Sequence, residues 1–503
     1  MSYKVLVADP ISVEGLKSLN DDADFEVIHQ TGLSEAELID TIQDYDALIV
    51  RSQTTVTADI LKAGQKLKVV ARAGVGVDNI DTETATKEGI IVINAPDGNT
   101  ISATEHSVAM ILSMARNIPQ AHASLSHGEW DRKTFRGTEF LAYDPYLSEE
   151  KAKELEFTRA TVDEIAQQAD FVTVHTPLTE KTKGIVNANF FNQAKPNLQI
   201  INVARGGIID ENALIDALDQ NKIAGAALDV FENEPAIDSP VTKHPKIIVT
   251  PHLGASTLEA QEKVAVSVAQ EIIDIIKHEN VANAVNAPSG VFNEDEELKP
   301  FVDLAKTTGK VGIQLLPKAP RTLKITYAGD IALDDTSLIT RTLVKGVLEQ
   351  DMGDHVNLIN ALVLLNEQNV TYTIEKTKKK KGFSNYIELE LINKGDVVKI
   401  GATVLNGFGP RIVRINDYPV DFKPEHYQLV IHHFDRPGIV GKTGQILGEH
   451  GVNIASMHLG RSQIGGDAMM ILSIDHPINE TVREALLKID GFQSVLQVTL
   501  DES

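Results

Sequence analysis

Three stretches in the middle of the chain each end a run of apolar or β-branched residues with one ionisable side chain beside glycine or proline. They run from Ile200 to Gly207, from Ala227 to Pro235 and from Thr250 to Thr257, and their ionisable side chains are Arg205, Glu234 and His252. Such runs are typical of strands in a parallel sheet, and open α/β folds bind ligands at the carboxyl ends of these strands. We therefore expect the three side chains to meet at one edge of a sheet.

The three residue types suit proton transfer on a small acid. An arginine can hold a carboxylate with two parallel hydrogen bonds, and a histidine can exchange a proton near neutral pH. A glutamate bonded to the histidine can orient the ring and favour its charged form. The predicted roles are substrate binding by Arg205, proton transfer by His252 and orientation of that ring by Glu234.

The same stretches contain VARGG, ENEP and PHLGAST in this order, and they resemble the D-isomer-specific 2-hydroxyacid dehydrogenase family. The resemblance covers nearly the whole chain. It implies an NAD-dependent oxidoreductase in which Arg205, Glu234 and His252 are catalytic, and in which C2 of the substrate gives its hydride to the nicotinamide. The long form of the family, which this chain resembles most, uses a phosphorylated 2-hydroxy acid in L-serine biosynthesis.

The resemblance also implies which residues contact the two ligands. The implied cofactor-binding residues are Val75, Asp144, Thr176, Val203, Ala204, Arg205, Asp229, His252, Gly254 and Ala255. The implied substrate-binding residues are Arg51, Ser52, Gly74, Gly76, Asn99, Arg205 and His252. The two glycines would let backbone N–H groups approach the substrate carboxylate; without the resemblance, this loop also fits a plain glycine turn beside a solvated arginine. We expect no metal site.

One part of the family pattern is missing. After Glu139 the family implies a strand, a G-x-G-x-x-G turn and a helix, but Phe140 to Pro145 follows at once and matches the next strand, with Asp144 as its acidic residue. No suitable G-x-G-x-x-G occurs, and the gap corresponds to one βα unit, on the order of 30 residues. Because the N-terminus of that helix normally binds the pyrophosphate, we expect weak NAD binding and a truncated, loosened Rossmann-like lobe.

Three hypotheses follow from this gap. The first is an active dehydrogenase with feedback control. The second is an NAD-deficient relative that senses an amino acid and joins intact subunits. The third is an error in the coding sequence around Glu139 and Phe140, which resequencing of the DNA would reveal.

Composition narrows the classes of partner and compartment. The chain has 503 residues, no cysteine and a net charge of −24. The length allows three or four domains, and the absence of cysteine excludes disulfides and fits a reducing cytoplasm. The negative charge argues against nucleic acid or an anionic membrane as partner. The first ten residues contain a short strand pattern rather than a signal peptide, and no apolar run reaches membrane-spanning length.

The fold class expected is α/β, with a flavodoxin-like substrate lobe at 1–98 and 255–286 and the cofactor lobe at 99–254. Strands are predicted at 4–8, 47–50, 69–71 and 91–94. A capping box at 102–105 predicts the start of a helix between the lobes, and its predicted apolar face holds Val108, Ile111, Leu112 and Ala115. His106 on this helix is expected to be structural. A long helix after Thr257 should return the chain to the first lobe.

Two further units complete the chain. Residues 297–424 predict an α+β intervening domain, where the long family members have a possible site for an anionic effector. Residues 425–503 predict a ferredoxin-like βαββαβ unit that resembles an ACT domain, an amino-acid sensor. The resemblance implies His433, Asp435 and Asn453 as effector-binding residues, with Asp435 where the serine-binding version has asparagine. A purely structural dimerisation role is the alternative, and we expect a homodimer or homotetramer.

Overall fold

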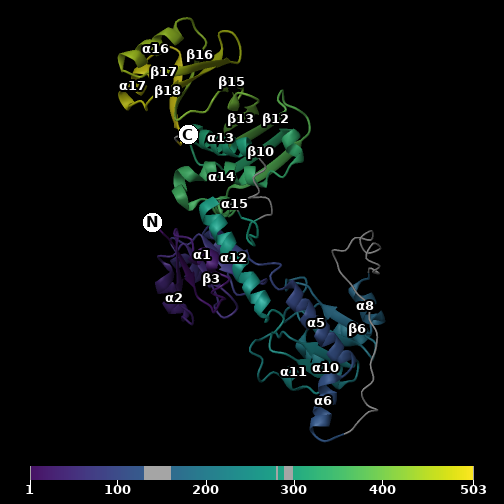
Figure 1. Ribbon diagram of the computed structural model, residues 1–503. Coiled ribbons are helices and arrows are strands. Elements are labelled where there is room, and N and C mark those ends of the chain that lie inside the picture. The colour runs from purple at the N-terminus through teal and green to yellow at the C-terminus, as the bar shows by residue number, and fades with distance from the viewer. Residues whose placement is uncertain (1, 130–159, 279–280, 288–297, 502–503) are drawn as a thin grey trace.

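The structure is a computed structural model that describes residues 2–129, 160–278, 281–287 and 298–501. The described residues form four β-sheets. Figure 1 shows an elongated molecule: the first lobe (purple) and the second lobe (blue to teal) lie at one end, the green intervening domain follows, and the yellow C-terminal unit lies at the other end. No helix in these residues is both long and apolar enough to cross a membrane.

The sheet of the first lobe has the strand order β2-β1-β3-β4-β5 and is parallel throughout. Its strands are β1 (Tyr3–Val7), β2 (Phe25–His29), β3 (Ala47–Val50), β4 (Val69–Arg72) and β5 (Ile91–Asn94). This order confirms the flavodoxin-like prediction. The edge strand β2 was not predicted, because it is only partly buried and its polar residues Glu26 and His29 hide the strand pattern.

Helices cover both faces of this sheet, which explains why every residue of β3 is buried. One face packs against α1 (Lys17–Asn20) and the long α12 (Leu258–His278). The other face packs against α2 (Glu35–Ile42), α3 (Ala58–Ala63) and α4 (Thr82–Lys87). As predicted, α12 begins after Thr257 and returns to the first lobe, where Val264, Val268 and Ile272 enter the core.

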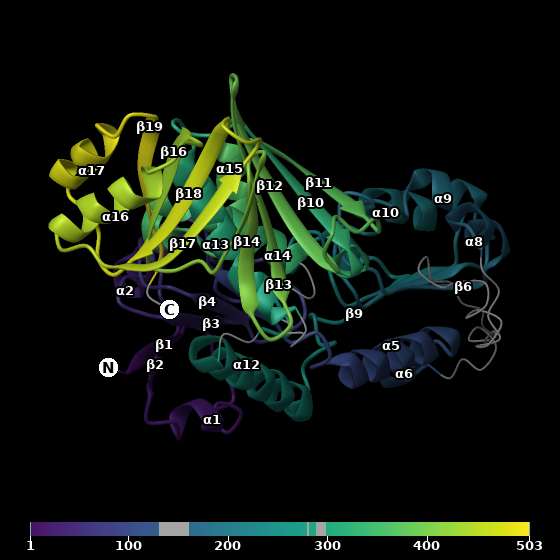
Figure 2. The same ribbon diagram turned by 90° about the horizontal axis from the view of Figure 1, so that it is seen from above.

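The sheet of the second lobe is also parallel, in the order β6-β7-β8-β9. Its strands are β6 (Phe171–Val174), β7 (Gln199–Asn202), β8 (Gly225–Leu228) and β9 (Ile247–Val249). One face packs against α5 (Thr100–Ala115), which continues into α6 (Ile118–Ser126), as Figure 2 shows. The other face packs against α8 (Val162–Gln168), α9 (Ala188–Gln193), α10 (Glu211–Asp219) and α11 (Pro240–Lys243). Among the strands described, β6 pairs only with β7; the predicted gap after Glu139 lies outside the described residues.

The prediction for α5 was wrong in two respects. The helix begins at Thr100, so the predicted capping residue Ser102 lies inside it and instead donates a hydrogen bond to the carbonyl of Gly254 at 2.8 Å. Of the predicted apolar face, Val108 is 48% exposed and Leu112 is 51% exposed. The buried face runs through Ser102 toward Met110 and Met114. It contains polar residues that are hydrogen-bonded to other parts of the fold, so the spacing of apolar residues does not predict it.

The intervening domain has a sheet in the order β11-β10-β12-β13-β14-β15, in which only the β10–β11 pair is parallel. Its strands are β10 (Thr322–Gly329), β11 (Thr371–Thr377), β12 (Asn385–Asn393), β13 (Asp396–Leu405), β14 (Gly409–Ile415) and β15 (Tyr418–Phe422). Its α-helices are α13 (Lys299–Leu315), α14 (Ser337–Met352) and α15 (Ala361–Glu367), with 3-10 turns at Asp330–Leu333 and Gly353–His355. The helices pack on one face of the sheet and bury its core.

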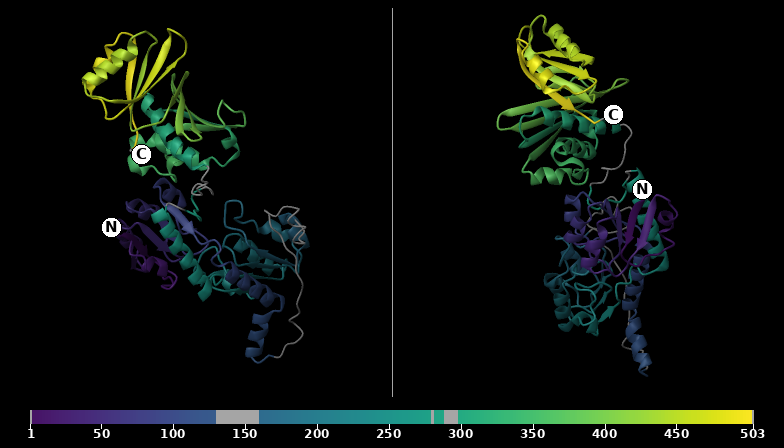
Figure 3. Two further views of the ribbon diagram at one scale, coloured as in Figure 1. Left: turned by 45° about the horizontal axis from the view of Figure 1, so that its top comes forward. Right: turned by 90° about the vertical axis from the view of Figure 1, so that its left-hand side faces the viewer.

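The C-terminal unit has the predicted βαββαβ order and an antiparallel sheet, β17-β18-β16-β19. Its elements are β16 (Tyr427–Phe434), α16 (Ile439–Glu449), β17 (Ile454–Arg461), β18 (Asp467–Ile474), α17 (Glu480–Leu487) and β19 (Phe492–Thr499). Helices α16 and α17 cover one face. The other face adds Val430, Met469 and Ile471 to the core of the intervening domain, so the two units lie against each other (Figure 3).

The end of the chain is bonded to the intervening domain through charged and polar groups. Asp501 contacts Nζ of Lys306 at 2.8 Å and Nζ of Lys310 at 2.5 Å, both on α13. These two hydrogen bonds, with Lys306 the larger contributor, lower the pKa of Asp501 to about 2. One turn further along α13, Gln314 exchanges two hydrogen bonds with the backbone of Thr499, both at 2.9 Å.

We expect Asp501→Asn to lower the free energy of unfolding by about 1 kcal/mol at pH 7, a value discounted because the carboxylate is 58% exposed. The folded-state pKa lies below the ordinary value of 3.8, so the stabilisation is present above pH 4 and is lost as the pH falls toward 2. Urea unfolding at pH 7 and pH 3 measures this. Asp490→Asn, which removes a more exposed pair with Arg436, is the control. An equal loss at both pH values would contradict the prediction.

Candidate active site

The structure brings His252 and Glu234 together at the carboxyl edge of the second sheet. His252 follows β9 and Glu234 follows β8, and His252 Nδ1 lies 2.7 Å from Glu234 Oε2. The other oxygen of Glu234 accepts a hydrogen bond from the backbone N–H of Phe231 at 3.0 Å. Burial raises the pKa of Glu234, but the bonds from His252 and Phe231 and the charges of His252 and Arg205 lower it more. Glu234 is therefore ionised at neutral pH and can orient the imidazole.

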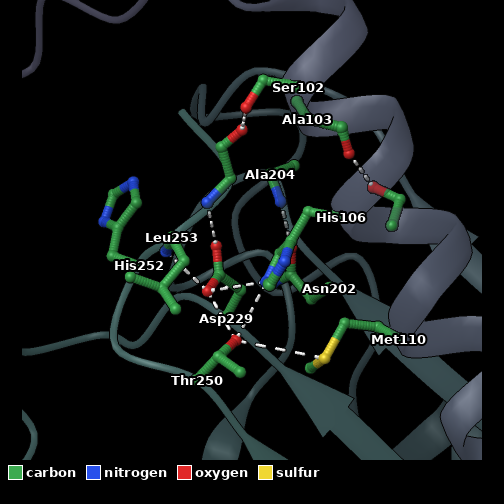
Figure 4. Close-up of polar contacts among 12 residues, drawn as sticks. Ser102, Ala103, His106, Met110, Asn202, Ala204, Asp229, Thr250, His252 and Leu253 are labelled. Atoms are coloured by element: carbon green, nitrogen blue, oxygen red, sulfur yellow. Dashed lines mark hydrogen bonds and ion pairs between the residues drawn. The ribbon is translucent and has the colours of Figure 1, made fainter. Parts of the chain in front are cut away.

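A buried carboxylate fixes the backbone of the loop that carries His252. Asp229 is fully buried and accepts hydrogen bonds from Leu253 N at 2.8 Å, Gly254 N at 2.9 Å and Thr250 Oγ1 at 2.6 Å (Figure 4). His252 itself has φ 56°, in the left-handed region, where a residue other than glycine costs about 1–3 kcal/mol and needs support from its surroundings. Asp229 was expected to contact the cofactor. In the structure its carboxylate is bonded to the loop and shapes it, and the contact with the cofactor stays a prediction.

A cavity of about 760 Å³ lies beside this pair and is of a size that holds a small molecule. Seven residues from the predicted catalytic, substrate and cofactor sets line it: Arg51, Ser52, Gly74, Asn99, Glu234, His252 and Ala255. The first three come from the first lobe and Glu234 and His252 come from the second lobe, so the cavity lies between the lobes. Arg205, Gly76, Val75, Thr176, Val203, Ala204, Asp229 and Gly254 are not among its lining residues.

A second buried carboxylate shapes the loop after β3. Asp9 is 1% exposed, and its Oδ2 accepts hydrogen bonds from the backbone N–H groups of Arg51, Gln53 and Thr54. The shortest of these bonds, to Arg51, is 2.6 Å. Because the backbone is held in this way, Arg51, Ser52 and Gln53 are placed at the wall of the cavity.

Arg205 lies across the boundary between the lobes. Its Nε donates to Oδ2 of Asp78 at 2.8 Å and its Nη1 donates to the carbonyl of Ala204 at 2.8 Å. Asn202 fixes this turn, because its amide donates to the carbonyl of Arg205 and its carbonyl accepts from Ala204 N. No local pattern indicated the pair with Asp78, which is 127 positions away. The guanidinium is thus held in place by Asp78 and by its own turn.

Gly76 provides the space for this guanidinium. A Cβ at position 76 would lie 1.7 Å from Arg205 Nη2 and 2.9 Å from Asp78 Oδ2. Gly76→Ala should therefore displace Arg205, and we expect KM for the acid substrate to rise by about tenfold, the effect of losing a hydrogen bond to a charged group. Steady-state kinetics with varied acid measures this. Gly448→Ala on α16 would add a Cβ with nothing within 4 Å at a glycine without a positive φ, and it is the control for a glycine replacement. An unchanged KM in Gly76→Ala would show that the position of Arg205 does not limit binding.

Arg72 was not among the predicted site residues. It ends β4 at the same sheet edge, lines the cavity, and has a buried Nε without a hydrogen-bond partner in the described residues. Burial, followed by the charges of Arg205 and Arg51, lowers its pKa to about 10, so it is still charged at neutral pH. Its position at the end of a strand, like that of Arg51 after β3, is the feature of the sequence that could have identified it as a site residue.

Gly74 was expected to let its backbone N–H approach the substrate carboxylate, and the structure gives a different reason for a glycine at this position. The N–H of Gly74 donates to the carbonyl of Arg72 at 2.8 Å, so this group is already bonded within the loop. A Cβ at position 74 would lie 1.4 Å from Nη1 of Arg72. Gly74 therefore makes room for a guanidinium and does not present a free N–H to a carboxylate.

The residues present fit the nicotinamide end of NAD. Thr176, in the loop after β6, has a buried hydroxyl without a partner among the described residues, which offers a polar contact to a bound group. Gly254 and Val203 are in close contact, since a Cβ at Gly254 would lie 3.2 Å from Val203 Cγ1. Val75 lies in the first-lobe loop, where its carbonyl accepts from Asn94. Asp144, predicted to contact the ribose, lies outside the described residues.

The three predicted effector residues are bonded in separate places in the C-terminal unit. His433 is buried, its Nε2 has no partner in the described residues, and its ring stacks on Phe492 at 5.8 Å. Asp435 accepts from Gly465 N and Arg461 Nη1, each at 3.1 Å, and these bonds lower its pKa. Asn453 donates to Asp475 at 2.9 Å. His433 and Asp435 are close enough to interact, because the charge of His433 also lowers the pKa of Asp435. Asn453 shares no hydrogen-bond partner with these two residues in the part of the chain that the structure describes.

Comparisons with known families agree with this arrangement. Residues 134–254 match the NAD binding domain of D-isomer specific 2-hydroxyacid dehydrogenases. Residues 297–416 match the D-3-phosphoglycerate dehydrogenase intervening domain, and residues 427–491 match the ACT domain. The NADPH-dependent glyoxylate/hydroxypyruvate reductase of Sinorhizobium meliloti, solved with NADP and malonate, has 25% identity and a TM-score of 0.51; the match covers 57% of this chain and 97% of that one.

Two full-length relatives are more similar in sequence. The D-3-phosphoglycerate dehydrogenases of Bacillus subtilis and Methanocaldococcus jannaschii are each 39% identical over 526 positions, which cover 99% of this chain and 100% of each relative. An alignment of 526 positions against 503 residues leaves at least 23 positions of each relative without a counterpart here. The chain belongs to the D-3-phosphoglycerate dehydrogenase branch of the D-isomer specific 2-hydroxyacid dehydrogenase family.

Proposed function

We propose that this chain oxidises 3-phospho-D-glycerate to 3-phosphohydroxypyruvate with NAD, the first step of phosphorylated L-serine biosynthesis. The observation that carries the proposal is the His252–Glu234 pair at 2.7 Å beside a cavity that Arg51 and Arg72 also line, in the wall that the first lobe contributes. Arg205 lies next to this wall. The substrate has a carboxylate and a phosphate, and guanidinium groups bind both in a bidentate manner.

The residues of the chain supply proton transfer and orientation. His252 Nε2 accepts the proton of the C2 hydroxyl, and the imidazolium that forms is stabilised by the ionised Glu234 at Nδ1. Arginines hold the carboxylate and the phosphate, which places C2 and its hydroxyl before His252. NAD, when bound, accepts the hydride from C2. Val203, Ala204, Thr176, Gly254 and Ala255 would hold its nicotinamide end.

The experiment compares 3-phospho-D-glycerate with D-glycerate, which lacks the phosphate. Purified protein is supplied with NAD near its solubility limit, and NADH formation is followed. We expect kcat/KM to favour the phosphorylated acid by at least about a hundredfold, because D-glycerate leaves the guanidinium groups for phosphate unpaired. Equal rates for the two acids would overturn the proposed substrate. No turnover of either acid at saturating NAD would overturn the proposed activity.

We also propose that the ACT unit binds an amino-acid effector, with L-serine the first to test, and that the protein is a cytoplasmic homodimer or homotetramer. The buried, unpartnered Nε2 of His433 supports an effector site. Because the carboxylate of Asp435 is bonded to Arg461 and Gly465, an amino group of the effector would compete with Arg461 for it. Calorimetric titration with L-serine, and light scattering for the subunit number, test these points.

A further inference from the structure

One face of α5 lies along the loop that carries His252. Ser102, His106 and Met110 are spaced by four residues, so they project from the same side of the helix. Ser102 Oγ donates to the carbonyl of Gly254 at 2.8 Å, and Met110 Sδ lies 4.0 Å from Thr250 Oγ1. Between them, His106 Nε2 lies 3.1 Å from Thr250 Oγ1 and 3.2 Å from Asp229 Oδ1 (Figure 4).

The hydrogen bonds around Thr250 determine which nitrogen of His106 carries a proton. The hydroxyl of Thr250 donates to Asp229 Oδ1 at 2.6 Å, so toward His106 the Thr250 oxygen can only accept. Asp229 is an acceptor on both oxygens, because it binds the N–H groups of Leu253 and Gly254. His106 Nε2 therefore bears hydrogen and is shared between Thr250 and Asp229.

Asp229 needs these donors because it is fully buried. A buried carboxylate is tolerated only when hydrogen-bond donors surround it, and removal of one donor weakens its hold on the others. The groups that share Asp229 with His106 are the hydroxyl of Thr250 and the two amides directly after His252. In Figure 4 the ring of His252 points away from α5, whereas its backbone lies next to Asp229. The contact from the helix therefore acts on the loop backbone and leaves the ring free.

We infer that His106 is a positioning residue for His252: from the helix between the lobes it completes the donor set of Asp229, and Asp229 in turn holds the 250–254 loop in its left-handed turn. His106 does not line the cavity. The same helix begins next to Asn99, which does line it. One helix thus connects Asn99, at the wall of the cavity, with the loop that carries His252.

The test measures amide hydrogen exchange by mass spectrometry in the full chain, so it needs neither NAD nor turnover. His106→Leu removes the donor and keeps an apolar side chain of similar size. We expect the 250–257 segment, which contains the amides of Leu253 and Gly254, to exchange at least about tenfold faster. His106→Gln, which can still donate near the position of Nε2, should stay within about threefold of the wild type.

Two controls separate a positioning role from general loss of packing. The α10 segment, residues 211–219, should exchange at the wild-type rate in all variants. His127→Leu changes an exposed histidine directly after α6 whose side chain, among the described residues, bonds to the carbonyl of Ala123, and it should leave the 250–257 segment unchanged. The inference is overturned if His106→Leu exchanges like the wild type, if His106→Gln is as fast as His106→Leu, or if α10 accelerates equally.

For the reaction, the inference rests on the proposed role of His252. Kinetically, His106→Leu should lower kcat by about tenfold and change KM for the acid by less than about threefold, since the residue acts on the loop and not on the substrate. A loss of turnover with unchanged exchange would overturn the positioning role and leave the proposed function standing. Faster exchange in a chain that has no turnover in its wild-type form would support the positioning role alone.

Discussion

His252→Asn should lower kcat for 3-phospho-D-glycerate by about 10²–10⁴-fold, the usual contribution of a general base, while KM for the acid changes by less than about threefold. The reason lies in the pair with Glu234. The bond of 2.7 Å from Nδ1 to the carboxylate leaves Nε2 as the nitrogen that can accept a proton. Asparagine keeps the size and polarity of the side chain but cannot accept a proton at neutral pH. Steady-state kinetics with varied acid at constant, high NAD measures the effect.

The loop around His252 requires a control for misfolding. Asparagine is well suited here, because it adopts the left-handed backbone region more readily than most residues, and position 252 has φ 56°. Circular dichroism and the melting temperature should therefore match those of the wild type. His127→Asn, at an exposed position directly after α6, is the matched substitution and should keep full activity. If His252→Asn retained kcat within about tenfold of the wild type, another group would have to take the hydroxyl proton.

Much of the candidate site could be predicted because each side chain lies in the loop that follows its strand. Glu234 and His252 come after β8 and β9, and parallel strands end at one edge, so their meeting follows from local pattern and the parallel topology. Arg205 was placed at the correct edge as well. Its bond to Asp78 could not be foreseen, because it joins two lobes that no local pattern relates.

The supports of the site were harder to predict than the site itself. Asp229 and Asp9 look like ordinary acidic residues in the sequence, yet both are buried and shape a loop through its backbone N–H groups. The face of α5 was misjudged for a related reason. Its inward side holds the buried Ser102 and the partly buried His106, whose polar groups are satisfied by distant partners. The spacing of apolar residues predicts which apolar side chains are buried. It does not predict the burial of a polar side chain whose hydrogen-bond partner lies far away in the sequence.

NAD should bind this chain about a hundredfold more weakly than it binds the Bacillus subtilis relative measured in parallel, because a pyrophosphate normally receives several N–H groups at a glycine-rich helix N-terminus. The sequence contains no suitable G-x-G-x-x-G, and at least 23 positions of that relative have no counterpart here. Loss of about 3 kcal/mol from these hydrogen bonds corresponds to the hundredfold change. The nicotinamide contacts remain, so binding should be weakened and not abolished. Calorimetric titration with NAD gives both dissociation constants.

A gain of affinity tests the cause more sharply than the weak binding does. Insertion of a strand–G-x-G-x-x-G–helix unit between Glu139 and Phe140 should tighten NAD binding by about a hundredfold, because it restores the helix N-terminus to which the pyrophosphate binds. The matched control inserts the same unit with its first two glycines replaced by valine, which keeps strand and helix propensity but blocks close approach of the phosphates. This control should bind NAD no better than the wild type.

The two titrations together decide between the hypotheses for the gap. Suppose that the wild type binds NAD weakly and that only the glycine-containing insertion raises the affinity. The pyrophosphate site would then be the part that is missing, and the His252–Glu234 pair would be ready to act once NAD is bound. Tight binding in the wild type would contradict the prediction and would require pyrophosphate donors elsewhere in the chain. A gain with both insertions would assign the defect to the edge of β6 that pairs with no other described strand, since an added strand would then stabilise the lobe without any contact to phosphate.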